Sequence, residues 1–458
     1  MPTLKLGNNA LLTLPTRITT PSIHIQKDGD HWYVPLFSGS KGAVVQSGDY
    51  NYTLGGLNVG IYRAAIGREE AVVDIYVFSS KNTTWILTSK GDLYGCGQNN
   101  VGQQGSGNTS NVLKFTKRAS NVKTVSCLDG TTWYIDNNNN LYGCGDGSYG
   151  KQGSGNTSNV YTFTKRASNV KTVSCSGGTT WYIDTSNNLY GCGRGDRGQQ
   201  GSNNTSDVLV FTKRASNVKE VSCSDGTTWY IDTSNNLYGC GSNGYGQQGT
   251  GNTSDVLVFT KRASNVKEVS CSFSTTWYID NNNNLYGCGY NYVGQQGANN
   301  MSNVLTFTKR ASNVKTVSCT NEVTWYIDNN NNLYGCGNSS SGQQGANAYS
   351  SALVFTKRAS NVKEFVCSDY TTWYIDNNND LYGCGQNNAG QQGSNNTSDV
   401  YTFTKRASNV KEVSCSTRTT WYIDNNNLYG CGYNGYGQQG SGTSGSSDIV
   451  KTFTKRDL

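Results

Sequence analysis

Most of this sequence contains neither histidine nor proline. Both histidines (His24, His31) and all four prolines (Pro2, Pro15, Pro21, Pro35) lie near the start of the 458 residues. Histidine is the usual general base near neutral pH, so the rest of the chain lacks the proton acceptor that nucleophile–histidine catalysis needs. We therefore expect no enzymatic activity and no catalytic residue. The break in composition predicts a domain boundary near residue 72.

Long apolar runs are absent too. No stretch approaches the roughly 18–20 apolar residues of a membrane span, and the start MPTLKLGNNALL lacks the basic-then-apolar pattern of a signal peptide. We expect a soluble protein, made in a cytoplasm, without membrane insertion.

What the sequence does contain is a repeat of 48 residues. One unit runs from Asn217 to Ser264, and similar units follow one another from about residue 73 to the C-terminus. Each unit contains four short segments with strand-forming character, which in the unit above are NVKEVSC, TTWYID, LYGCG and VLVFTKR. The Asp of TTWYID precedes an Asn-rich stretch and is expected to cap a tight turn. Four strands per unit are typical of a β-propeller blade.

Two segments of the unit resemble a known family. LYGCGSNGYGQQG (Leu237–Gly249) and VSCSDGTTWYI (Val221–Ile231) are similar to the regulator of chromosome condensation repeat, although Thr-Thr-Trp and Cys-Gly replace the family's usual His-Thr and Trp-Gly. The resemblance covers residues 73–458 and implies a propeller, usually of seven blades, whereas eight units are counted here. Exchange-factor activity on chromatin, known in the family, rests on loops that are not matched.

The fold prediction is therefore an all-β propeller of seven or eight four-stranded blades at residues 73–458. Residues 1–72 would form a small β-rich module for attachment or oligomerisation. The 15 cysteines fall at two fixed positions of the unit. If consecutive strands pair, the two positions lie two strands apart, near 10 Å, which is too far for a disulfide within a blade. Buried reduced thiols are favoured over an inter-blade disulfide ladder or a metal site, and no cofactor is expected.

The units differ from one another mainly at two places. These are three residues after the first strand and four residues after the third. Strand parity brings both loops to one face, whereas the Asn-rich turn emerges on the opposite face and hardly changes. Exposed Tyr, Asn, Ser and Arg are typical of binding surfaces. The candidate ligand-binding residues are Tyr149, Arg194, Arg197, Tyr245, Phe273, Tyr290, Tyr292, Tyr370, Arg418, Tyr433 and Tyr436.

The favoured hypothesis is a non-enzymatic binding protein that presents this face to a protein or a cell-surface glycan. Residues 1–72 would join it to a larger assembly, such as the virion or tail of a bacteriophage, where it would bind a receptor. An intracellular scaffold or chromatin-type binder would instead use a ring of Lys-Arg pairs (Lys165, Arg166, Lys213, Arg214, Lys261, Arg262). The net charge of +7 is low for a nucleic-acid binder. A purely structural virion component that binds its own copies is the third alternative.

Overall fold

The computed structural model describes residues 74–128, 130–272 and 274–458, together with six short strands earlier in the chain. The chain divides into two compact units, Met1–Val73 and Asp74–Leu458. In the first unit, four strands form an antiparallel sheet in the order β2-β1-β5-β6 and two form a hairpin. Their bounds are β1 (Thr3–Leu6), β2 (Ala10–Thr13), β3 (Gln26–Asp28), β4 (His31–Tyr33), β5 (Tyr50–Leu54) and β6 (Leu57–Ile61). The other residues of this unit, and with them the predicted attachment role, lie outside the described residues.

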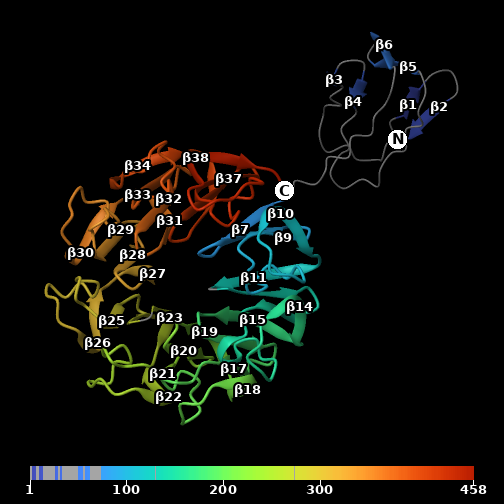
Figure 1. The fold of residues 1–458 in the computed structure, drawn as a ribbon. Helices are drawn as coiled ribbons and strands as arrows, with labels where there is room; N and C mark the ends of the chain where they lie inside the picture. The colour runs from blue at the N-terminus through green and yellow to red at the C-terminus, as the bar shows by residue number, and fades with distance from the viewer. Residues whose placement is uncertain are drawn as a thin grey trace. The chain divides into compact units, whose positions relative to one another are not determined.

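The second unit is a propeller of eight antiparallel sheets, each with four strands in chain order (Figure 1). Blades 1 to 8 begin at β7, β11, β15, β19, β23, β27, β31 and β35. Blades 1 to 4 comprise β7 (Ile75–Ser79), β8 (Thr83–Thr88), β9 (Leu93–Gly97), β10 (Val112–Ala119), β11 (Val122–Leu128), β12 (Thr131–Asp136), β13 (Leu141–Gly145), β14 (Val160–Ala167), β15 (Val170–Cys175), β16 (Thr179–Asp184), β17 (Leu189–Gly193), β18 (Val208–Ala215), β19 (Val218–Cys223), β20 (Thr227–Asp232), β21 (Leu237–Gly241) and β22 (Val256–Ala263).

Blades 5 to 8 repeat the pattern. They comprise β23 (Val266–Cys271), β24 (Thr275–Asp280), β25 (Leu285–Gly289), β26 (Val304–Ala311), β27 (Val314–Cys319), β28 (Val323–Asp328), β29 (Leu333–Gly337), β30 (Ala352–Ala359), β31 (Val362–Cys367), β32 (Thr371–Asp376), β33 (Leu381–Gly385), β34 (Val400–Ala407), β35 (Val410–Cys415), β36 (Thr419–Asp424), β37 (Asn427–Tyr433) and β38 (Ile449–Arg456). One short 3-10 helix, η1 (Ser148–Gly150), lies in a loop of blade 2. None of the described residues forms a helix with the length and apolar character that crossing a bilayer requires.

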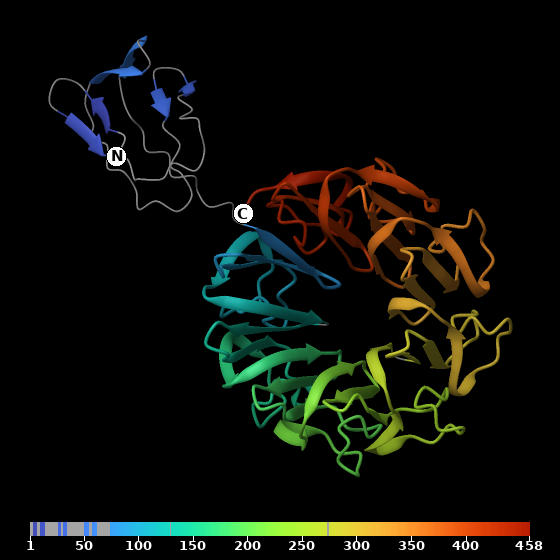
Figure 2. The ribbon, with the colours of Figure 1, turned by 180° about the vertical axis from the view of Figure 1, so that it is seen from behind.

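The first strand of each blade lies nearest the centre of the ring and the fourth lies at the rim, as both ribbon views show (Figure 2). Within blade 4, Trp229 of β20 stands opposite Gly239 of β21. A Cβ atom at Gly239 would lie 2.4 Å from the Trp229 ring, and Trp229 is fully buried. The glycine of LYGCG is therefore required because the tryptophan ring occupies the space that a side chain would fill.

Adjacent blades are joined by aromatic contacts. The outer strand of blade 5 carries Phe307, whose ring meets Trp229 of blade 4 edge-on at 5.8 Å and Tyr278 of its own blade at 4.9 Å. The long loop of blade 4 also reaches blade 5, because the backbone N–H of Gly251 donates to Leu305 O at 2.8 Å. Each interface thus combines a buried aromatic cluster with a loop that crosses to the next blade.

The ring closes through the same contacts as every other interface. The Phe115 ring of blade 1 meets Trp421 of blade 8 at 5.8 Å, and Gly442 N donates to Leu113 O at 2.8 Å. The hydroxyl of Thr84 donates to Gln438 O at 2.9 Å. The first repeat of the propeller, which has Ser79 where the other repeats have cysteine, is consequently a full blade. The count of eight is confirmed and the family's usual seven does not apply.

The turn between the second and third strands is capped by its aspartate, as predicted. In blade 4, Asp232 Oδ1 accepts hydrogen bonds from the backbone N–H groups of Ser234 and Asn236, at 2.9 and 2.8 Å. Asn235 has a φ of 60°, which asparagine tolerates better than most residues. This local requirement explains why the turn hardly varies between blades.

Candidate binding face

The two variable loops of each blade lie on one face of the propeller, which we call the loop face. It comprises the triplet after the first strand and the tetrad after the third. In the described residues, loops of neighbouring blades are tied together there: Lys151 Nζ donates to Gly177 O at 2.7 Å and Gln295 Nε2 to Asn321 O at 3.0 Å. The Asn-rich turn lies at the other end of the strands, where Asn139 O accepts from Val170 N at 2.8 Å. The prediction that both variable loops lie on one face and the Asn-rich turn on the other is thus correct.

The second position of the tetrad belongs to the framework rather than to the exposed surface. In blade 4, Asn243 is fully buried; its Nδ2 donates to Asn252 O at 2.9 Å and its Oδ1 accepts from Gln248 N at 2.8 Å. Gln248 Nε2 donates in turn to Cys240 O at 2.7 Å. The glutamines of GQQG therefore bond backbone groups, as predicted, and they fix the shape of the loop that carries the exposed positions.

Two of the predicted arginines lie over predicted tyrosines. The guanidinium carbon of Arg194 is 5.1 Å from the centre of the Tyr149 ring, across the boundary between blades 3 and 2. That of Arg418 is 5.4 Å from the Tyr433 ring, and Tyr433 meets Tyr436 edge-on at 6.1 Å. These are cation–π contacts, worth about 0.5–1 kcal/mol at exposed sites. The chain thus supplies a cation to each of these tyrosines.

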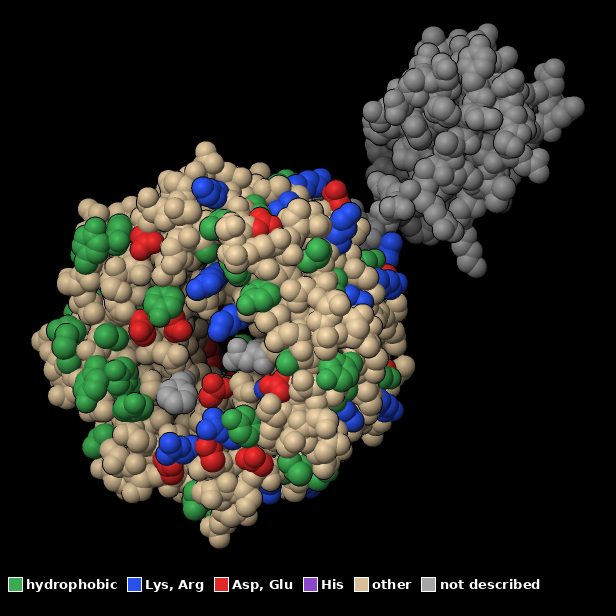
Figure 3. Space-filling model, in the orientation of Figure 1, with side chains coloured by type: hydrophobic (Ala, Val, Ile, Leu, Met, Phe, Trp, Pro, Cys, Tyr) green, Lys and Arg blue, Asp and Glu red, His purple; other side chains and the backbone are tan. Residues whose placement is uncertain are grey.

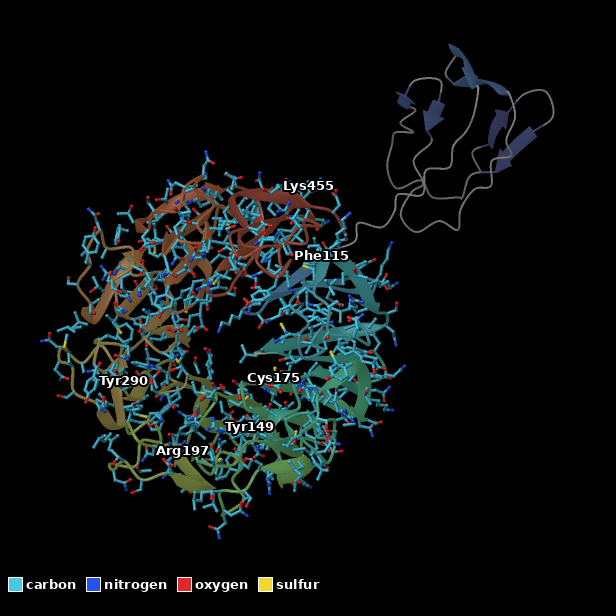
Figure 4. The ribbon with its side chains drawn as sticks, in the orientation of Figure 1. Phe115, Tyr149, Cys175, Arg197, Tyr290 and Lys455 are labelled. Atoms are coloured by element: carbon cyan, nitrogen blue, oxygen red, sulfur yellow. The ribbon has the colours of Figure 1, made fainter. Side chains whose placement is uncertain are left out.

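Three other predicted tyrosines form a cluster without an arginine. Tyr290 meets Tyr245 of the preceding blade and Tyr292 of its own loop, each edge-on with ring centres 4.9 Å apart. Tyr292 is 58% exposed and Tyr245 37%, so the cluster presents aromatic surface to solvent. Figure 4 labels Tyr290, Tyr149 and Arg197 at separate places around the ring.

The remaining predicted residues have separate surroundings. Arg197 Nη1 lies 3.6 Å from Asp255 Oδ2 of the next blade. The ring of Tyr370 lies close enough to Glu322 that this carboxylate is the largest cause raising the pKa of its hydroxyl. Phe273 lies outside the described residues. The predicted face is therefore several clusters separated around the ring.

Glu322 is a residue of the loop face that was not among the candidate residues predicted from the sequence. It ends the triplet of blade 6, and Asn338 Nδ2 donates to its Oε2 at 2.6 Å. Its signal was available, because glutamate replaces the glycine or serine that ends the triplets of blades 2 to 5. The candidate ligand-binding residues predicted from the sequence were all Tyr, Phe or Arg, so Glu322 was not among them.

A polar cleft opens on the loop face between blades 1 and 2. Its volume is about 320 Å³, and Lys81, Asn82, Gln98 and Asp146 lie in its lining. Asn82 Nδ2 donates to Gln98 Oε1 at 2.9 Å, while the carboxylate of Asp146 is paired with Lys151 at 2.7 Å. None of the predicted site residues lines this cleft.

The Lys-Arg pairs lie on the outer strands, where Figure 4 labels Lys455 and Phe115 at the rim. The lysines of the predicted ring, Lys165, Lys213 and Lys261, are exposed, whereas the arginines that follow them are partly buried. Burial lowers the pKa of Arg166, as it does for its counterparts in the other blades. The arginines, which are half of the predicted basic ring, thus pack into the blades. This weakens the hypothesis of a scaffold or chromatin-type binder that uses the ring.

The 15 cysteines all lie in the described residues, and none of them takes part in a disulfide there. Those of LYGCG are fully buried, and Cys240 Sγ donates to Gln199 O of the preceding blade at 3.4 Å. Those of the first strands are half-buried near the channel, where Figure 4 labels Cys175. Burial raises the pKa of Cys415 to about 12. Among the described residues, no group of three or more His, Cys, Asp or Glu side chains is placed to hold a metal ion.

A sequence profile of the regulator of chromosome condensation (RCC1) repeat matches residues 218–247. This segment spans β19, β20, β21 and the start of the loop that follows them. The chain carries RCC1-like repeats. No curated protein sequence matches it.

Solved structures share the fold of this RCC1-like propeller. Human WBSCR16 has a TM-score of 0.58 and 15% identity, with 71% of this chain and 96% of that chain covered. Prp20p from Saccharomyces cerevisiae, whose binding to Gsp1p and histones is described, has a TM-score of 0.58 and 13% identity, with 72% and 90% covered. Yeast RCC1 (Prp20) bound to Kap60 has a TM-score of 0.58 and 13% identity, with 75% and 87% covered.

Proposed function

We propose that this RCC1-like propeller is a non-enzymatic binding protein whose loop face contacts a protein partner. The observation that carries the proposal is the contrast between the two faces. Exposed Tyr149, Tyr245 and Tyr292 stand on a buried framework of amide hydrogen bonds, whereas the opposite face repeats the same capped turn. Tyrosine on a rigid support provides contact area at low entropic cost.

The related structures support a protein as the partner. Prp20p is described with Gsp1p and histones, and it has been solved with Kap60. A glycan is the competing ligand from the sequence, and the polar cleft between blades 1 and 2 is where it would fit. The aromatic clusters lie outside that cleft, which favours a broad protein surface over a sugar pocket.

The test is affinity capture with the full chain as bait, followed by identification of the bound molecules. One variant combines Tyr245→Ala, Tyr290→Ala and Tyr433→Ala on the loop face. A control combines Ser186→Ala and Ser234→Ala, two exposed residues in the turns of the opposite face. A partner held by the native chain and the control but lost by the tyrosine variant supports the proposal. A partner retained by the tyrosine variant contradicts it.

We further propose that residues 1–72 attach the propeller to a larger assembly, such as a phage tail in which it would bind a receptor. The division of the chain into two compact units supports a separate role for them. Sedimentation of the full chain and of residues 74–458 tests this step. Self-association present in the full chain and absent from the shorter one is expected. Identical monomeric behaviour of both would assign no oligomerising role to residues 1–72.

A further inference from the structure

Basic residues occupy only half of the loop face. In the triplets and tetrads of blades 8, 1, 2 and 3 the sequence has four Lys or Arg and three Asp, whereas those of blades 4 to 7 have no Lys or Arg and three acidic residues, so only the second set has a net negative charge. We call these two sets the basic half and the acidic half. The basic residues are Arg418, Lys81, Arg194 and Arg197, and the acidic residues of blades 4 to 7 are Asp225, Glu322 and Asp369. Asp225 lies close to Arg194, which borders it from blade 3.

The acidic half also contains the cluster of Tyr245, Tyr290 and Tyr292, which, in the part of the chain that the structure describes, has no arginine over its rings. Figure 3 shows hydrophobic side chains gathered where Figure 4 labels Tyr290, with acidic side chains beside them and no basic side chain among them. In the other half, Arg194 covers Tyr149 and Arg418 covers Tyr433. Two tyrosines of the loop face are therefore already in contact with a guanidinium group of the same chain.

Glu322 lies at the centre of the acidic half. Burial raises the pKa of Tyr290, and the neighbouring tyrosines and Glu322 add to it, while Glu322 is the main cause for Tyr370. The carboxylate thus belongs to the electrostatic surroundings of a ring from blade 5 and a ring from blade 7. Its Oε2 accepts from Asn338 at 2.6 Å, and no lysine or arginine of the described residues forms an ion pair with it.

The loops that hold these groups are tied to one another. Gln295 of blade 5 donates to Asn321 O at 3.0 Å, and Asn321 N donates to Asp369 Oδ1 of blade 7 at 3.1 Å. These bonds hold the loop backbones beside Glu322 and Tyr370 and reduce the entropy that a ligand would have to remove. A fixed carboxylate with aromatic neighbours is complementary to a cation.

We propose that Tyr290, Glu322 and Tyr370, which we call the Glu322 site, bind an arginine side chain presented by a protein partner. Arginine is favoured over lysine because its flat guanidinium can stack on a tyrosine and donate two hydrogen bonds to a carboxylate at once. The chain's own Arg194 combines the two kinds of contact: its guanidinium lies over the Tyr149 ring, and its Nη2 donates one hydrogen bond to Asp196 Oδ2 at 2.6 Å. In the Glu322 site the ring and the carboxylate come from the propeller and the guanidinium comes from outside.

This inference rests on the proposed function, since it names the chemistry by which the loop face would recognise its partner. The overall charge makes it testable with a simple probe. Because the chain carries a net charge of +7, a cationic peptide is repelled by the molecule as a whole, and its binding must come from a local site.

The experiment measures binding of fluorescent peptides to the full chain by anisotropy at near-physiological salt. The probe is a Gly-Arg repeat peptide. Matched peptides carry lysine or citrulline in place of arginine, and citrulline keeps the shape of arginine without its charge. Binding in the order arginine, lysine, citrulline is expected, with citrulline at least tenfold weaker than arginine. Equal binding of the arginine and citrulline peptides would overturn the proposal.

Two substitutions in the Glu322 site and one control outside it test where the peptide binds. Glu322→Gln keeps an oxygen that Asn338 can donate to, and it should weaken arginine-peptide binding at least tenfold. Tyr161→Ala removes an exposed ring from the outer strand β14, outside the loop face, and should leave binding unchanged. Tyr370→Ala provides a second test of the same site, and the thermal unfolding midpoint of each variant verifies its fold. Unchanged binding in both site variants would refute the Glu322 site. If the captured partner still required the loop-face tyrosines, the proposed function would stand without it.

Discussion

Glu412 should make the stability of the propeller depend on pH. It lies on β35 at the closure between blades 8 and 1, where its Oε1 accepts one hydrogen bond, from Val77 N at 3.2 Å. Burial raises its pKa from 4.5 to about 7, with Glu364 as a smaller contribution of the same sign. The equivalent Glu268 accepts two hydrogen bonds, from Thr316 Oγ1 at 2.9 Å and Val317 N at 3.2 Å. Glu412 lacks the hydroxyl donor because Tyr76 precedes Val77 in blade 1.

The sign of the effect follows from proton binding. Between pH 4.5 and about 7 the folded state holds a proton on Glu412 that the unfolded state has released, so the free energy of unfolding falls as the pH rises through this window. Each pKa unit corresponds to about 1.4 kcal/mol. Because the carboxyl group is partly exposed and screened by solvent, we expect a loss of about 1–2 kcal/mol rather than the full product.

The assay is urea unfolding followed by tryptophan fluorescence at pH 5 and pH 8. We expect Glu412→Gln to equal the native chain at pH 5 and to exceed its stability by about 1–2 kcal/mol at pH 8, because glutamine has no charge to desolvate. Tyr76→Thr should narrow that difference by supplying the hydroxyl that Thr316 gives to Glu268. The reasoning fails if the native chain and Glu412→Gln lose the same stability between the two pH values, since Glu412 would then contribute nothing.

Two further predictions concern packing between blades. Gly105→Asn should cost about 2–3 kcal/mol, because a Cβ atom there would lie 2.5 Å from the Phe163 ring of the next blade. Gly107→Asn should change stability by less than about 0.5 kcal/mol, since asparagine occupies that position in other blades with a similar positive φ. Phe259→Ala, which removes a ring from two aromatic contacts, should cost about 3 kcal/mol, whereas Val258→Ala on the exposed side of the same strand should cost under about 1 kcal/mol. Urea unfolding measures all four, and equal effects within either pair would refute its packing argument.

The period of the sequence predicted the blade well because each strand is specified locally. The strand-forming residues of TTWYID, the glycine beside the tryptophan and the Asp-capped turn all act within one unit, so the sequence of a single unit contains them. Nearly the same pattern recurs in all eight repeats, so each of them predicts the same four-stranded blade. The closure of the ring was harder to predict, because the first repeat departs from the others at Ser79; the contacts of Phe115, Gly442 and Thr84 with blade 8 show that it packs as a blade.

The loop face could be predicted only in part. Strand parity placed the two variable loops together, but variation alone did not distinguish the buried Asn243 from the exposed Tyr245 two positions later. Contacts between blades could not be predicted from the sequence, because every repeat has nearly the same residues and a side chain could contact either neighbouring blade. The structure resolves this by showing that the long loop always crosses to the next blade, as Gly251 does to Leu305.

This direction of crossing explains how one face can vary while the fold persists. The framework of each loop is buried and bonded to backbone atoms, as Gln248 is to Cys240 O, so its stability does not depend on which side chains stand at the exposed positions. Exposed positions contact one another across blades, as Tyr245 contacts Tyr290 and Arg194 contacts Tyr149, and within a blade, as Arg418 contacts Tyr433. The framework thus accommodates a basic half and an acidic half on one ring. A partner that matched both halves would be held in a single orientation.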